Sequence, residues 1–296
     1  MHRLIFVFID GIGLGAAGDD NPFDVDGLSG FERFSGGRRW TTDTGEISRS
    51  ERTLFTQLDA TLGVSGLPQS GTGQATLFTG VNCAERAGRH YGPFPHSTSL
   101  PVLNEHSLFA VIEATAFANA YPDRFLERSR RRNRWSVTTR SCIQAGLSIR
   151  TIDDLTRGRA VSADLTRAGL SSVAGVELDV IRESEAAEHL VGLAADHRLT
   201  VFEYFHTDKV GHAQDREAAD ARLASLSAFL DALVDMAANH DITVLVSSDH
   251  GNLEDLSVKT HTRNPVPLAV AGPEPGVFAS CRSLTDVSPA VRRLLS

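Results

Sequence analysis

Hydrophobic and polar positions along the chain form blocks that predict buried strands separated by helices. Continuous apolar runs at 4–9, 199–205 and 242–247 predict fully buried strands, because a strand covered on both faces lacks the polar alternation of a surface strand. Shorter strands are predicted at 116–120 and 267–271. Apolar residues at helical spacing predict helices at 51–62, 70–78, 104–114, 183–197, 216–239 and from Pro289 onward.

The order of these elements predicts an α/β fold. Strands that alternate with helices over most of the chain imply a mostly parallel sheet flanked by helices on both faces. Residues 13–50 are rich in Gly, Asp, Arg and Thr and are expected to be an irregular excursion, whereas the polar segment 125–172 is expected to be a small inserted cap. We therefore predict a core made of 1–124 and 173–296, with the cap between its two parts.

The composition is that of a folded, soluble protein. Of the 296 residues, 41% are hydrophobic and 22% charged, a balance that excludes intrinsic disorder. The net charge of -8 argues against nucleic acid as a partner, because an acidic protein repels a phosphate backbone. No apolar stretch reaches the roughly 18 residues of a membrane span, so no membrane partner is expected. Three cysteines without CxxC spacing fit a reducing cytoplasm; no oligomeric state is predicted.

Three of the predicted strands end in residues that can bind metal ions. Asp10 follows the first, Asp208 follows the second and Asp249 follows the third. Because the carboxyl ends of parallel strands meet at one edge of a sheet, these carboxylates are expected to lie close together. His212 stands four residues after Asp208, which places both on one face if the segment is helical. The full candidate set is Asp10, Asp208, His212, Asp249, His250 and His261.

Three aspartates and three histidines suit two divalent ions better than one. Oxygen and imidazole ligands of this kind accept Mn, Zn or Mg, and they do not choose sharply among them. Taken singly, each aspartate has an alternative role as a turn former or a helix N-cap. The joint pattern favours metal binding.

The segment PQSGTGQ places a hydroxyl at the start of the predicted helix 70–78, among residues small enough for a ligand to approach. A helix N-terminus attracts phosphate, and a hydroxyl bound to a divalent ion is activated as a nucleophile. Ser70 and Thr72 are both candidates on these grounds. The structural alternative is a serine N-cap in a glycine-rich loop.

Five motifs, FIDGIG, SGTGQ, TDxxGH, SDHGN and HTxNPVP, together resemble the alkaline phosphatase superfamily, specifically its cofactor-independent phosphoglycerate mutase and phosphopentomutase branch. The resemblance covers about 1–122 and 173–296 and implies an alkaline phosphatase-like fold. It selects Ser70 over Thr72 as the nucleophile, because the family nucleophile opens a Ser/Thr-x-x-Gly-His pattern. The sequence departs from this pattern at Gln74, which is a candidate substrate contact and not an expected metal ligand.

The resemblance also divides the ligands between two ions. It assigns the first ion to Asp208, His212 and His261. It assigns the second ion to Asp10, Ser70, Asp249 and His250.

The implied reaction is phosphoryl transfer from a small phosphorylated metabolite through a phosphoserine. Attack by water on that intermediate gives a phosphatase, whereas return of the phosphoryl group to the substrate gives a mutase. A mutase needs a closing lid that excludes water. The predicted cap is much smaller than the inserted domain of the phosphoglycerate mutases, so we favour hydrolysis of a small phosphomonoester, with an intramolecular phosphomutase of phosphoglycerate or phosphosugar type as the alternative. A non-catalytic metal-binding protein is the alternative from another class, and the complete ligand set argues against it.

Further substrate contacts are expected from two segments. Residues 128–134 carry five arginines, of which Arg128 and Arg130 are candidates for binding an anionic substrate; the alternative is a solvated basic loop. His90 and Tyr91, in GRHYGPFP, are candidates for the pocket wall, and an ordinary turn is the alternative there.

Overall fold

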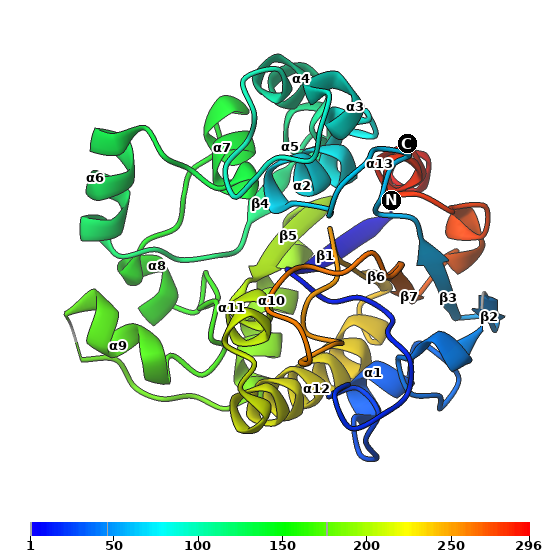
Figure 1. Ribbon diagram of the computed structural model, residues 1–296. Helices are drawn as coiled ribbons and strands as arrows, with labels where there is room; N and C mark the ends of the chain where they lie inside the picture. The colour runs from blue at the N-terminus through cyan, green and yellow to red at the C-terminus, as the bar shows by residue number, and fades with distance from the viewer. Residues whose placement is uncertain (1, 46, 176) are drawn as a thin grey trace.

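The computed structural model describes residues 2–45, 47–175 and 177–296 and places their seven strands in one sheet (Figure 1). The strands are β1 (Arg3–Ile9), β2 (Ile47–Arg49), β3 (Thr53–Leu58), β4 (Thr115–Phe117), β5 (Leu199–Tyr204), β6 (Ile242–Ser247) and β7 (Val266–Ala271). Their order across the sheet is β2-β3-β7-β6-β1-β5-β4. β4, β5, β1 and β6 run parallel, whereas β7 is antiparallel to β6 and β3, and β3 is antiparallel to β2. The predicted α/β class with a mostly parallel sheet is confirmed.

Helices cover both faces of this sheet (Figure 1). The helices are α1 (Ser29–Glu32), α2 (Ser70–Thr79), α3 (Cys83–Ala87), α4 (Ser99–His106), α5 (Leu108–Val111), α6 (Asp123–Arg132), α7 (Val137–Gln144), α8 (Ile152–Thr156), α9 (Ala168–Ala174), α10 (Glu183–Ala195), α11 (His206–Ala213), α12 (Arg216–Ala238) and α13 (Leu284–Leu294). One face of the sheet carries α1, α10 and α12, and the other carries α2, α4, α5 and α13. No helix in the described ranges is long and apolar enough to span a bilayer.

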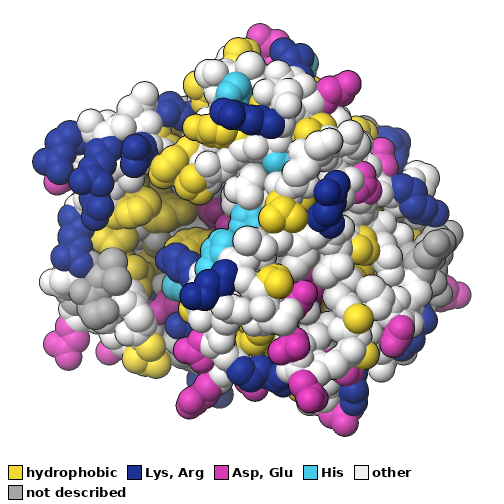
Figure 2. Space-filling model, viewed as in Figure 1, with side chains coloured by type: hydrophobic (Ala, Val, Ile, Leu, Met, Phe, Trp, Pro, Cys, Tyr) yellow, Lys and Arg dark blue, Asp and Glu magenta, His cyan; other side chains and the backbone are white. Residues whose placement is uncertain are grey.

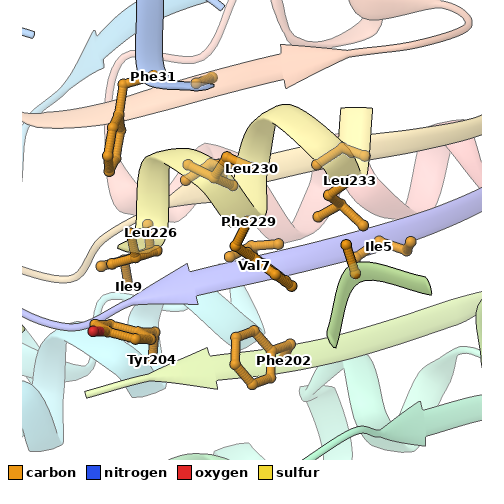
Figure 3. Close-up of a cluster of buried hydrophobic side chains, with 14 of the residues drawn as sticks. Ile5, Val7, Ile9, Phe31, Phe202, Tyr204, Leu226, Phe229, Leu230 and Leu233 are labelled. Atoms are coloured by element: carbon orange, nitrogen blue, oxygen red, sulfur yellow. The ribbon is translucent and has the colours of Figure 1, made fainter. Parts of the chain in front are cut away.

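The central strand β1 contributes to the core on both faces, because alternate side chains of a strand point in opposite directions. On the face covered by α12 lie Ile5, Val7 and Ile9, beside Leu226, Phe229, Leu230 and Leu233 (Figure 3). On the other face, Phe78 of α2 packs against Phe6 and Phe8 with ring centres 5.4 and 5.6 Å away. Each such buried side chain contributes about 1.5–3 kcal/mol. The end of β1, where Asp10 stands, is therefore held in a defined place.

Several predicted elements differ from the structure. The helix predicted at 51–62 is wrong, since this segment forms β3, whose Leu54 and Phe55 are buried and which pairs with β7 along its whole length. Cross-strand pairing and burial overrode the weak helical spacing. The helix predicted at 104–114 is two helices, α4 and α5, which meet at Ser107. The closing helix begins at Leu284, where Ser283 forms a capping box, so Pro289 lies inside it.

The predicted irregular excursion 13–50 holds only short elements in its described part, namely α1, the 3₁₀ turn Thr42–Thr44 and β2. The segment 125–172, predicted as a cap, includes α7 and α8 and parts of α6 and α9. Of these, α7 packs against α2, α4 and α5 of the core. The division into core and cap stays a prediction.

Candidate metal centre and its cavity

The candidate metal ligands stand where strands of the sheet end. Asp10 follows β1, Asp249 and His250 follow β6, and α11 begins after β5. β1 lies between β5 and β6, so these three strand ends are neighbours. Gly11 has a φ of 72°, and a Cβ there would lie 2.8 Å from the Asp208 side chain. Glycine at this position lets the chain turn away from β1 while α11 approaches closely.

The first cluster consists of Asp208, His212 and His261. The first two lie on one face of α11, with Nε2 of His212 3.5 Å from Oδ2 of Asp208. His261 comes from the loop before β7, and its Nε2 lies 3.4 Å from Oδ1 of Asp208. The potential ligand atoms all lie within 4.8 Å of one another, a spacing suited to one shared ion.

The second cluster consists of Asp10, Asp249 and His250, again with ligand atoms within 4.8 Å of one another. Nε2 of His250 lies 3.4 Å from Oδ1 of Asp10 and 3.5 Å from Oδ2 of Asp249. The His250 ring stacks on that of His261, with ring centres 3.8 Å apart. The two clusters are therefore adjacent.

The histidine rings are oriented as metal ligands usually are. Nδ1 of His212 lies 2.7 Å from the backbone oxygen of Lys259, and Nδ1 of His261 lies 2.7 Å from that of Pro68. A carbonyl oxygen only accepts hydrogen bonds, so each Nδ1 carries a proton, and in the neutral ring each Nε2 is the nitrogen free to bind a metal ion.

The electrostatics of the second cluster also favour binding of a cation. Oδ1 of Asp10 and Oδ2 of Asp249 are buried without a hydrogen-bond partner. Burial, together with the charge of Asp208, raises the pKa of Asp249 to about 7, and burial and the charge of Asp249 raise the pKa of Asp10. Burial also lowers the pKa of His250 to about 3, so this ring is neutral. Buried carboxylate oxygens that lack hydrogen-bond partners, next to the neutral imidazole of His250, form a suitable site for a divalent cation.

Ser70 is the first residue of α2 and stands beside the second cluster. Its Oγ is hydrogen-bonded to Nε2 of His250 at 3.0 Å, and its side chain reaches the cavity described below. Thr72, the other candidate nucleophile, is fully buried, and its hydroxyl accepts from the backbone N–H of Tyr91. Thr72 does not line the cavity.

The glycines around Ser70 admit protein backbone rather than the ligand expected from the sequence. A Cβ on Gly71 would lie 2.1 Å from the carbonyl oxygen of Phe94, and a Cβ on Gly73 would lie 2.8 Å from that of Asp249. Gly71 therefore lets α2 pack against the loop with Tyr91 and Phe94, and Gly73 lets it pack against the loop that carries Asp249.

A cavity of about 740 Å³ opens over the clusters. Its lining includes Ser70 together with Asp10 and Asp208, one carboxylate from each cluster. Gln74 also lines it, and its amide Nε2 lies 3.4 Å from Oδ2 of Asp10. Figure 2 shows the corresponding hollow, with hydrophobic side chains in it, histidines beside it and Lys and Arg side chains around it.

One face of α6 forms part of the cavity wall. The residues on this face follow helical spacing: Phe125, Arg128, Ser129 and Arg132. Of the arginines proposed as substrate contacts, Arg128 lies on this face, whereas Arg130 is exposed and does not line the cavity.

His90 and Tyr91 do not line the cavity, although Pro93 and Phe94 of the same segment do. Nε2 of His90 is 3.3 Å from the backbone oxygen of Val64. The Tyr91 ring packs edge-on against His96, with ring centres 4.9 Å apart.

Sequence reasoning missed several residues of the site. Among the lining residues that were not predicted as substrate contacts are the charged side chains of Glu203, Lys209 and Arg222. Glu254 was also missed; it is buried, and its carboxylate accepts from the backbone N–H groups of Gly13 and Asn252, both at 2.8 Å, and from Thr262 and Asn264. Its position after the SDHGN motif was the one available signal.

Fold and site together define a metalloenzyme of α/β class with two neighbouring Asp/His clusters. The chain belongs to the metalloenzyme superfamily, whose family model matches residues 2–296. It is accordingly an enzyme with divalent metal cofactors, as the resemblance implied.

Curated relatives match part of the chain. It is 36% identical over 105 residues to the 2,3-bisphosphoglycerate-independent phosphoglycerate mutase of Desulforudis audaxviator and 31% identical over 105 residues to that of Anaplasma phagocytophilum. Each match covers 33% of this chain and only 20% and 21% of the respective relatives.

Solved structures match nearly all of the chain at low identity. A cold-active alkaline phosphatase from Shewanella sp. superimposes with a TM-score of 0.54 at 11% identity, covering 100% of both chains. The phosphoglycerate mutase of Leishmania mexicana, solved at low cobalt concentration, gives a TM-score of 0.52 at 11% identity and covers 99% of this chain and 95% of its own. These similarities confirm the alkaline phosphatase-like fold.

Proposed function

We propose that this protein is a phosphoryl-transfer enzyme with two divalent ions, which acts through a phosphoserine at Ser70 and hydrolyses a small phosphomonoester. The observation that supports this proposal is the floor of the cavity, where the Ser70 hydroxyl is accessible beside one carboxylate from each Asp/His cluster. A substrate in the cavity would meet the nucleophile and both ion sites at once.

The ligands of each ion follow from the two clusters. One ion would be held by Asp208, His212 and His261, and the other by Asp10, Ser70, Asp249 and His250. When bound, such ions lower the pKa of a hydroxyl and offset charge on phosphoryl oxygens; Mn, Zn and Mg remain the candidates.

The residues of this chain provide the rest of the reaction. The Ser70 proton passes to solvent, and Oγ attacks phosphorus in line with the leaving oxygen, which takes up a proton and departs as the alcohol, so that one P–O bond forms and one breaks. The N-terminus of α2 adds a positive dipole end beside the phosphoserine. Arg128 on the cavity wall attracts the anionic substrate, and Gln74 holds Asp10 in place. Water then attacks phosphorus, which releases inorganic phosphate and restores Ser70.

A phosphomutase is the second candidate, because the curated relatives are named as mutases. It shares every step up to the phosphoserine. It differs only in returning the phosphoryl group to another oxygen of the same substrate.

The three cysteines support the cytoplasm as the compartment. Cys83, Cys142 and Cys281 are buried free thiols. Disulfides are rare in reducing compartments, where such thiols persist.

The test uses metal-stripped protein resupplied with Mn, Zn or Mg and a panel of phosphomonoesters that includes phosphosugars and phosphoglycerates. Released phosphate and isomerised product are measured in the same samples, with Ser70→Ala as the control. Release that requires both metal and Ser70 supports the phosphatase. Isomerised product without released phosphate would contradict the phosphatase and support the mutase. If the fully metal-loaded chain gives neither product, both functions are contradicted.

A further inference from the structure

The cavity is larger and less polar than a three-carbon phosphate ester requires. Its volume of about 740 Å³ lies in the upper part of the range that encloses drug-sized ligands. Away from Ser70 its wall is largely apolar, with Pro93, Phe94, Tyr121, Pro122, Phe125 and Leu170. Polar side chains such as Arg134, Ser162 and Asp164 also line the cavity, so the apolar residues form one part of its wall.

Two of these residues form a flat aromatic surface. The rings of Phe125 and Tyr121 stack with an interplanar angle of 14° and centres 5.0 Å apart. Tyr121 is buried, whereas Phe125 is 42% exposed and is the one aromatic ring among the exposed large hydrophobic residues of the described chain. The free part of the Phe125 ring is therefore available to a ligand in the cavity.

Buried polar groups hold this aromatic surface in place. The hydroxyl of Tyr121 accepts from Oγ1 of Thr139 at 3.5 Å, and the carboxyl group of Glu203 beside it accepts from Oγ1 of Thr138 at 2.6 Å. The backbone of Glu203 is fixed in turn by the Asn119 side chain, which accepts from its N–H at 2.8 Å and donates to its oxygen at 2.7 Å. A ring fixed in this way loses little conformational entropy when a ligand stacks on the assembly.

The charged residues of the same helix face suit a phosphate ester that carries a ring. Arg128 and Arg132 follow Phe125 on the wall formed by α6. Guanidinium groups attract the anionic ester, and their planes also stack on aromatic faces. The helix therefore presents an aromatic contact and two cationic contacts toward one cavity.

We propose that the cavity selects phosphomonoesters whose alcohol part carries a flat aromatic ring, with Phe125 stacked on Tyr121 as the surface that binds the ring. This selectivity rests on the proposed phosphoryl transfer at Ser70 and defines its substrate class. Phosphosugars and phosphoglycerates are the poorer substrates.

The test compares 2-phenylethyl phosphate with glycerol 3-phosphate on the metal-loaded protein. Both are esters of primary alcohols, so the leaving groups are similar in basicity. We expect kcat/KM for 2-phenylethyl phosphate to be higher by about tenfold or more, given what burial and stacking of one ring contribute. In Phe125→Ala this preference falls by about tenfold, mainly through KM, and Phe125→Tyr restores it. Val111→Ala, an exposed apolar position outside the cavity, leaves the preference as in the wild type.

A direct binding measurement separates this inference from the proposed function. Calorimetry with benzylphosphonate and methylphosphonate, neither of which can be hydrolysed, reports binding without turnover. If benzylphosphonate binds more tightly than methylphosphonate, and Phe125→Ala removes this difference, the aromatic site is supported. Absence of ester hydrolysis in the same protein would contradict only the proposed phosphatase. Metal-dependent hydrolysis that favours glycerol 3-phosphate, with no effect of Phe125→Ala on either ligand, would overturn the aromatic site and leave the phosphatase standing.

Discussion

Nε2 of His212 and Nε2 of His261 face each other at 3.2 Å, although the two residues are 49 positions apart. Both Nδ1 atoms donate to backbone carbonyls, so when both rings are neutral their Nε2 lone pairs repel each other beside the Asp208 carboxylate. A cation bound by all three groups turns this repulsion into coordination. The loops that supply the two carbonyls thus orient the rings for metal.

The second cluster should be removable without loss of the first. Asp249→Asn takes one charge and one ligand oxygen from the group of Asp10, Asp249 and His250. We expect the metal content of the purified protein to fall from two ions per chain to one, measured by mass spectrometry of the metals after dialysis.

The matched control for this change is Asp241→Asn. Asp241 is exposed and precedes β6, the strand whose other end carries Asp249. Its metal content should equal that of the wild type. Two ions retained by Asp249→Asn would show that this carboxylate is not a ligand.

Ser70→Ala should abolish the phosphoenzyme while the protein stays folded and keeps the ion of the Asp208 cluster. The hydroxyl is the group proposed to bond to phosphorus, so we expect phosphate release to fall by at least about 10³-fold. The phosphoenzyme is detected by intact-mass spectrometry after acid quench of a reaction with substrate.

Thr72→Val serves as the control, because it removes the hydroxyl from the other candidate nucleophile of the same helix. This variant should still form the phosphoenzyme. Ser70→Ala with activity near that of the wild type would move the nucleophile to Thr72.

The proximity of the candidate metal ligands could be predicted from the sequence because their spacing follows the backbone. Asp10 and Asp249 each end a continuous apolar run, and Asp208 and His212 are one helical turn apart. The sheet then brings the strand ends together through parallel pairing of β1 with β5 and β6. Secondary structure alone was sufficient to place these residues near one another.

The walls of the cavity depend on tertiary contacts and could not be predicted in the same way. Glu203 lies inside the apolar run 199–205 and shows no pattern that separates it from its buried neighbours. Only the packing of Tyr121 and Thr138 against β5 shows what its carboxyl group binds. β3 was mistaken for a helix for a similar reason, since its strand geometry comes from pairing with β7.

Arg128 should contribute more to substrate binding than Arg130, because only the former lines the cavity. We expect Arg128→Ala to raise KM for a phosphomonoester about three- to tenfold, as loss of one solvated charge contact would. Arg130→Ala provides the comparison, since it removes the same side chain from the same helix. Equal effects of the two substitutions on KM would point to a general electrostatic attraction by residues 128–134 instead of a contact at Arg128.

Glu254→Gln should destabilise the loops that carry ligands of both clusters. Oε2 accepts from two backbone N–H groups and Oε1 accepts from Thr262 and Asn264, so an amide NH₂ either faces two N–H donors or forces both side chains to reverse. We expect the free energy of unfolding in urea to fall by about 1–3 kcal/mol. Glu188→Gln, on the exposed surface of α10, is the control and should change little. A stability equal to that of the wild type would mean that water or rearranged loops satisfy these donors.

Glu203 should make the protein less stable as the pH rises. Burial raises the pKa of this carboxyl group from 4.5 to about 7, although Thr138 and Tyr121 donate hydrogen bonds to it. Between these two pH values the folded chain holds a proton that the unfolded chain has released, so the free energy of unfolding falls with increasing pH. A shift of this size corresponds to a loss of about 3 kcal/mol.

Glu203→Gln isolates this effect, because glutamine has the shape of the protonated group and does not titrate. The free energy of unfolding is measured in urea from about pH 4 to pH 8 for both proteins, in the same chelating buffer, since the charge of Glu203 also acts on Asp10. The wild type should lose stability relative to the variant as the pH rises toward 7, and the difference should level off above that pH. Parallel pH profiles would show that Glu203 ionises as an exposed carboxyl group does, and that its bonds to Thr138 and Tyr121 outweigh its burial.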